Sequence, residues 1–313
     1  MIRIASTASA LMLIMPVVAP SGGSALQVQP VEASLVPSSN VTTRVENVRM
    51  ADDGARRTSA GAALAPYSYA DLVDLAAPAD LVVVAKVRRV SRLDTDRTGP
   101  VRPGWARIYV EADTLRLLAG TVPIGQNLRY LADVPLTAKG RLPVLKNRSV
   151  VLFAQPVRNR PAQLQLVAPD AQVFADEVDE AQLRALLTEL VDPASLPAIS
   201  GVRDILHTPG NLAGEGETQI FLMTQGDEAA SITVRHRPGQ EREWGVSAGE
   251  LVDPAARPPQ PQTLAWYRLA CALPAELPVT AQISDDPGLQ AIASNDYALV
   301  VRQLGPCVRH RTS

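Results

Sequence analysis

Five strand-like segments follow one another between residues 80 and 173, with no long amphipathic helix between them. Residues 80–90 form a β-branched run that becomes alternating at its end, and residues 105–118 alternate at Ile108, Val110, Ala112 and Thr114. Three further candidates lie at 127–134, 149–156 and 163–173. Short strands at such even spacing are typical of all-β units of the small-barrel type. We therefore expect a small β-barrel here.

A change from strand-like alternation to helical spacing of the apolar residues marks the end of this unit. Leu183, Leu186, Leu187 and Leu190 recur at helical spacing, Asp179 can cap the helix and Pro193 ends it. A shorter helix capped by Ser68 is expected to precede the first strand. We predict a first domain over 66–192, consisting of the barrel and its closing helix.

The second half of the chain is expected to be a β-rich domain with short helices, over 197–313. Residues 219–223 and 230–236 indicate a hairpin, and 243–246 a third strand. Short helices are expected after Thr263 and after Asp286-Pro287, with a final strand at 297–301. The predicted fold class is mainly β, a β-rich α+β protein.

The N-terminus has the pattern of a secretory signal peptide. A cationic start at Arg3 precedes an apolar run over 8–19, and Gly23-x-Ala25 supplies a small-residue cleavage site. The apolar run is shorter than the roughly 20 residues that span a bilayer. A buried N-terminal helix is the alternative. We expect a signal peptide over 1–25, a disordered lead-in over 26–65, and a periplasmic or secreted protein without a transmembrane segment after cleavage.

The two cysteines, Cys271 and Cys307, are expected to form a disulfide, as cysteine pairs do in oxidising compartments. The alternative is a metal site, because His310 follows Cys307 by three residues, although no matching second pair of ligands is visible. The three histidines share no metal-ligand spacing, so neither a metal nor a cofactor is predicted. His236, between two arginines, is expected to face solvent.

Charge and composition exclude several partners. The net charge is −2, and the chain has three tryptophans, six tyrosines and three phenylalanines. Nucleic-acid binding is disfavoured because there is no basic field and few rings for base stacking. Lys86, Arg88 and Arg92 share one face if their strand is regular. This stripe is a possible interaction face for a protein partner. The alternative, which is more common for such charges, is a solvated surface.

The segments 79–87, 109–112, 117–120 and 147–153 together resemble a module of secreted bacterial proteins. They are similar to the OB-like barrels of the netrin and tissue-inhibitor-of-metalloproteinase type, over residues 66–175. The resemblance implies an OB-like fold for this segment. Members that inhibit proteases coordinate a metal through an N-terminal cysteine, and no cysteine occurs in residues 26–75, so that activity does not carry over.

Residues 245–249, Gly-Val-Ser-Ala-Gly, match the G-x-S-x-G nucleophile elbow. The chain order permits Ser247 as nucleophile, His310 as base and an acid between them (Asp285, Asp286 or Asp296). However, no alternating strand–helix series precedes the motif, and Ser247 with Glu250 also fits a helix capping box. The sequence favours a non-enzymatic exported protein that binds an envelope or secreted partner, with a serine hydrolase using Ser247 as the alternative.

Overall fold

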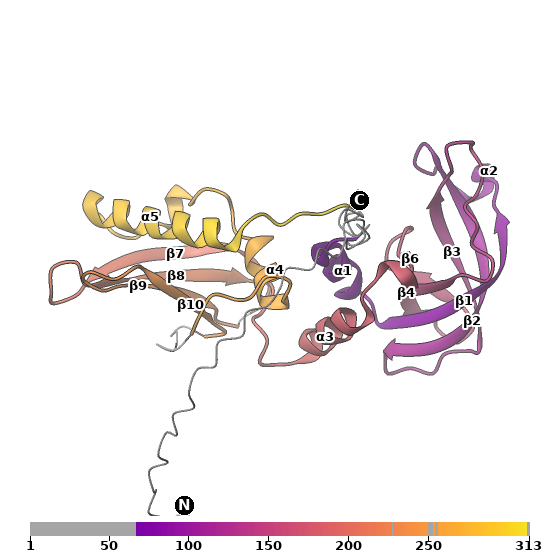
Figure 1. Ribbon diagram of the computed structural model, residues 1–313, viewed down its shortest axis with the longest axis horizontal. Helices are drawn as coiled ribbons and strands as arrows, with labels where there is room; N and C mark the ends of the chain where they lie inside the picture. The colour runs from indigo at the N-terminus through magenta and orange to yellow at the C-terminus, as the bar shows by residue number, and fades with distance from the viewer. Residues whose placement is uncertain (1–66, 227, 250–252, 254–255, 312–313) are drawn as a thin grey trace, which may run out of the picture. The chain divides into compact units, whose positions relative to one another are not determined.

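The computed structural model describes residues 67–226, 228–249, 253 and 256–311. The expected signal peptide and lead-in lie outside these residues. Within them, the chain forms ten strands in two antiparallel sheets, together with helices (Figure 1). The expectation of a mainly β fold is confirmed.

The first sheet contains six strands in the order β3-β2-β1-β4-β5, with β6 also paired to β4. The expected strand at 163–173 is divided into two short strands, and a single helical turn, α2 (Thr95–Thr98), lies between the first two strands. The strands are β1 (Leu81–Arg92), β2 (Trp105–Ala119), β3 (Asn127–Pro135), β4 (Ser149–Pro156), β5 (Leu164–Leu166) and β6 (Gln172–Phe174).

This sheet is not the closed barrel that we expected. The outer edge of β3 meets the chain around β5 only locally, through amide N–H groups of Arg129 and Asp133 that donate to the carbonyls of Ala162 and Pro169. β5 is three residues long and pairs with β4. Pro161 and Pro169 flank β5, and neither has an N–H to donate to a ladder. The sheet therefore curves toward closure without completing it.

Both faces of the sheet are buried at the start of β1 and in the middle of β4, which explains the unbroken apolar run at the start of β1. One face, with Val83 and Leu152, packs in the core within the curved sheet. The other, with Val82 and Phe153, packs under α1 (Tyr69–Ala76) and α3 (Glu180–Val191). The predicted N-caps of these helices are present, at Ser68 and Asp179. A short 3-10 turn, Ala175–Glu177, precedes α3.

The second sheet has the order β10-β9-β8-β7, and α5 lies along one of its faces (Figure 1). Ile220, Val234 and Trp244 pack there against Tyr297 and Val300 of the helix. Its elements are β7 (Ile199–Pro209), β8 (Gly216–Thr224), β9 (Ser231–His236), β10 (Glu243–Ser247), α4 (Leu264–Ala270), a 3-10 turn at Val279–Ala281 and α5 (Pro287–Leu304).

Two features of this half differ from the sequence predictions. The expected final strand at 297–301 belongs to α5, which begins at the cap of Asp286 and continues to Leu304. The apolar run is short, and its buried residues follow a helical stripe rather than strand alternation. Strand β7 was not predicted, because two register shifts between Ile199 and Asp204 interrupt its alternation.

The predicted disulfide is confirmed. Cys271, directly after α4, is bonded to Cys307, beyond the end of α5. Both thiols are consumed by this bond, so the alternative of a metal site at Cys307 and His310 has no free cysteine ligand. The chain after Cys307 then docks on α1, because the amide N–H groups of His310 and Arg311 donate to the carboxylate of Asp71.

Candidate functional site

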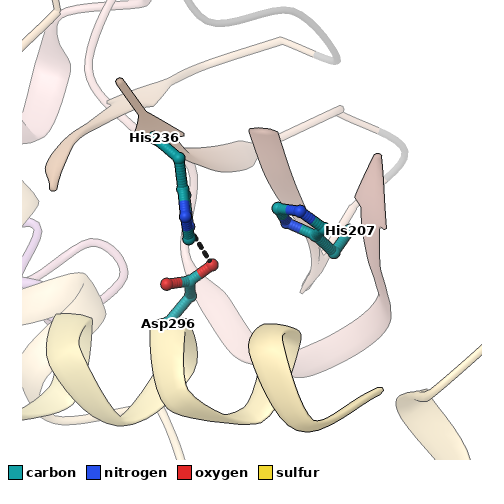
Figure 2. Close-up of side chains that lie close together, drawn as sticks. All are labelled: His207, His236 and Asp296. Carbon is teal, nitrogen blue, oxygen red and sulfur yellow. Dashed lines mark hydrogen bonds and ion pairs between the residues drawn. The ribbon is translucent and has the colours of Figure 1, made fainter. Parts of the chain in front are cut away.

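Two of the three histidines lie beside one buried carboxylate (Figure 2). His207 comes from β7, His236 from β9 and Asp296 from α5. One ligand atom from each residue lies within 4.8 Å of the other two, and the imidazole rings are 5.0 Å apart between centroids. The sequence analysis expected His236 to face solvent, but its side chain is only 14% exposed.

The register of the sheet explains this convergence. His207 is paired with Thr218 across β7 and β8, and His236 is paired with Gly216 across β8 and β9. Residues 216 and 218 share a face because strand side chains alternate, and this face continues into the core at Ile220. The two histidines thus lie at one end of the buried surface that α5 covers.

Gly216 provides space for the His207 ring. A Cβ atom at this position would lie 2.7 Å from both Cε1 and Nε2 of His207. Real Cβ atoms do not approach other heavy atoms so closely, so a larger residue would displace the imidazole. The glycine at the start of β8 is therefore part of the site's construction.

Asp296 is fully buried and accepts hydrogen bonds on both of its oxygens. On Oδ2, His236 Nε2 approaches to 2.7 Å and Thr218 Oγ1 donates at 2.5 Å. On Oδ1, Nη1 of Arg242 donates at 2.8 Å. The Arg242 side chain is 41% exposed, whereas that of Asp296 is 0% exposed. A guanidinium at the surface therefore compensates a carboxylate in the interior.

The hydrogen bonds also assign the protons of His207. Thr218 gives its single hydroxyl proton to Asp296, so its oxygen accepts from Nδ1–H of His207, 2.8 Å away. Nε2 of the neutral ring then carries the lone pair. Burial lowers the pKa of His207, the neighbouring His236 lowers it further, and the Asp296 charge opposes both effects. The cluster thus presents neutral imidazole nitrogen beside a carboxylate.

Sequence reasoning missed this cluster because it looked for ligands spaced along one segment. The three residues are brought together by strand pairing and by helix packing, which sequence spacing does not report. The sequence does contain one signal for the cluster. His207, Thr218 and His236 each lie two residues from an apolar core residue of the same strand, so each occupies an inward-facing position with a polar side chain. Recognising it required the register of β7, the strand that was not predicted.

The serine motif lies in a different structural setting from a nucleophile elbow. Ser247 is the last residue of β10 and is paired with Ser231 on β9. Gly249 accepts a hydrogen bond from the Ser231 hydroxyl at 2.7 Å. Glu250, the other half of the expected capping box, lies outside the described residues, and Ser247 itself is in a strand. In the described part of the chain, no hydrogen bond joins Ser247 to a histidine.

Gly245 has a packing role in this motif. A Cβ atom there would lie 2.7 Å from the backbone of Ala256. We expect Gly245→Ala to lower the free energy of unfolding by about 1–3 kcal/mol, because Ala256 must move away. Urea denaturation measures the free energy of unfolding, and Ser247→Ala on the same strand is the control. Equal stability of Gly245→Ala and the native chain would contradict the close contact between Gly245 and Ala256.

The basic stripe does not form one regular face. A register shift between Val87 and Arg89 places a bulge at Arg88. Lys86 is paired with Asp113, whereas Arg92 is paired with the core residue Ile108, so the two lie on opposite faces. Lys86, Arg88 and Arg92 are all exposed, and Arg88 forms an ion pair with Asp113 at 3.2 Å.

Aromatic side chains gather at a second location, a pocket of about 320 Å³. Tyr67, Trp105 and Phe174 line it, in a chain with few aromatic residues. The guanidinium of Arg102 lies 4.8 Å from the centre of the Trp105 ring, and that of Arg148 lies 4.2 Å from the centre of the Phe174 ring. These contacts hold both rings in place.

The ionisable groups of this pocket are either paired or shifted by burial. Arg311 is paired with Asp170 at 2.8 Å, and both side chains are largely buried. Burial raises the pKa of the Tyr67 hydroxyl to about 12, with Glu177 and Asp170 adding to the effect. Burial also raises the pKa of Glu177. Burial of Tyr67 and Glu177 thus accompanies the aromatic walls of the pocket.

Comparison with known protein families gives no matching family, and comparison with curated proteins gives no matching relative. Within the described residues, no helix is both long and apolar enough to cross a bilayer.

Proposed function

We propose that this chain is a non-enzymatic exported protein that binds another component of the cell envelope or the secreted milieu. The signal-peptide pattern over 1–25 supports export, and the Cys271–Cys307 disulfide fits an oxidising compartment. The observation that carries the binding function is the pocket lined by Tyr67, Trp105 and Phe174.

Such a pocket has the composition of a recognition site. Aromatic and arginine side chains are enriched where binding energy concentrates, and ligand pockets begin at about 300 Å³. Arg311 is already paired with Asp170 and Asp133 with Arg107, and the three aromatic rings supply ring surface to the pocket. The partner group that fits best is an apolar or aromatic side chain of a protein.

A photo-crosslinking residue at position 102 tests this proposal. Arg102 lines the pocket and covers Trp105, and Arg203 on β7 covers Phe221 in a similar way, at 5.3 Å, so position 203 is a matched control. In cells exporting the protein, we expect a specific adduct from position 102 that is absent from position 203 and lost with Trp105→Ala. Identical adducts from both positions, or none from position 102, would contradict the proposal.

The alternative function, a serine hydrolase, is tested by labelling with a fluorophosphonate probe. The G-x-S-x-G motif is the observation in its favour. We expect no labelling that depends on Ser247, because a nucleophile needs a neighbouring base and Ser247 lies within a sheet pairing. Labelling of the native chain that disappears in Ser247→Ala would establish the hydrolase instead.

A further inference from the structure

We propose that His207, His236 and Asp296 form a binding site for a divalent transition-metal ion. Zn²⁺ is the ion used to test it. The site is separate from the aromatic pocket and does not depend on the proposed binding function. It is built by three different elements, β7, β9 and α5, that meet at one end of the second core (Figure 2).

The donor set selects the class of ion. Two imidazole nitrogens and one carboxylate oxygen suit Zn²⁺ and its neighbours among the transition metals. Ca²⁺ and Mg²⁺ prefer sites made of oxygen ligands, and they are disfavoured by the histidines. Three protein ligands leave a further position of a tetrahedral ion for water or another small ligand.

The geometry requires modest adjustments in both directions. Ligands about 2.0–2.1 Å from a tetrahedral ion lie roughly 3.4 Å from one another. His236 Nε2 and Asp296 Oδ2 are 2.7 Å apart and must separate by about 0.7 Å, as the ion takes the place of the proton between them. The remaining adjustment, from at most 4.8 Å, is within reach of side-chain rotation at His207.

The surroundings of Asp296 resemble the supporting layer of a metal site. Thr218 and Arg242 donate to the carboxylate, and such outer contacts fix the orientation of a ligand. Gly216 keeps space beside the His207 ring. His236 and Gly216 also line a surface pocket, which brings solvent to one side of the cluster.

Calorimetric titration of the chelator-treated, full chain with ZnCl₂ tests the proposal, using protein without a polyhistidine tag. We expect one ion per chain with a Kd on the order of micromolar or tighter. His207→Gln and His236→Gln should each weaken binding by at least about tenfold. His310→Gln, which changes the third histidine, should bind Zn²⁺ like the native chain. Mg²⁺ at the same concentration should give no binding heat.

A second measurement on the native chain covers the case in which a variant fails to fold. Because the chain has only three histidines, the imidazole ¹⁵N resonances can be followed individually by NMR. Zn²⁺ should shift those of His207 and His236 and leave His310 unchanged. Undetectable binding at millimolar Zn²⁺, full binding retained in folded His207→Gln and His236→Gln, or a response confined to His310 would each overturn the site.

Discussion

Asp296→Ala is expected to lower the free energy of unfolding by about 3–5 kcal/mol, the range for removing one partner of a buried ion pair. The substitution leaves His236 and Thr218 facing a cavity without their acceptor, and Arg242 without its counter-ion. An unsatisfied buried donor carries the desolvation penalty that the hydrogen bond had offset. Because these partners link α5 to the sheet, the loss weakens the whole second core.

Chemical denaturation of the two proteins measures this difference. Asp286→Ala is the matched control, because it removes an aspartate from the same helix at its exposed N-cap, with an expected loss of about 1 kcal/mol. Asp296→Asn should fall between the two, since an amide oxygen still accepts a hydrogen bond. A loss for Asp296→Ala no larger than that of the control would contradict a structural role for the buried network.

Removing the disulfide is expected to have a comparable effect. Cys271 and Cys307 are separated by 36 residues in sequence, and the loop-entropy model assigns about 4 kcal/mol to a link of this length. The double variant Cys271→Ser, Cys307→Ser should therefore unfold at clearly lower urea concentration than the native chain. The bond ties the end of α4 to the segment after α5, so its loss frees both.

Two measurements check this prediction. In urea denaturation, reductant should lower the stability of the native chain by the same amount as the double substitution does. Reductant should have no effect on the stability of the double variant. Intact mass after alkylation, with and without prior reduction, shows whether exported material carries the bond. Two alkylated thiols before reduction, or unchanged stability of the variant, would contradict the stabilising role of the disulfide.

The features that sequence reasoning predicted well are those set by local chemistry. Ser68, Asp179, Thr263 and Asp286 are all N-caps in the structure, because a short polar side chain before a helix binds exposed amide groups wherever it occurs. Strands β2, β3 and β4 lie within a few residues of their expected bounds. Their regular alternation on a half-buried sheet leaves a readable pattern.

The features that were missed depend on contacts between distant segments. Bulges hide the alternation of β7, and the apolar run at 297–301 is compatible with either a helix or a strand until its partners are known. The incomplete closure of the first sheet depends on where β5 pairs. The His207, His236 and Asp296 cluster depends on both features of the second half, since it needs β7, its register with β8 and the helix α5.

The most direct test of the binding function compares three exported chains side by side: native, Trp105→Ala and Ser247→Ala. In-cell crosslinking followed by quantitative mass spectrometry measures the partner that each one captures. We predict a specific envelope or secreted protein with the native chain and with Ser247→Ala, and its loss by at least about tenfold with Trp105→Ala, as expected for an aromatic residue at the centre of a binding pocket. Equal capture by Trp105→Ala, or loss of capture only with Ser247→Ala, would contradict binding through the aromatic pocket.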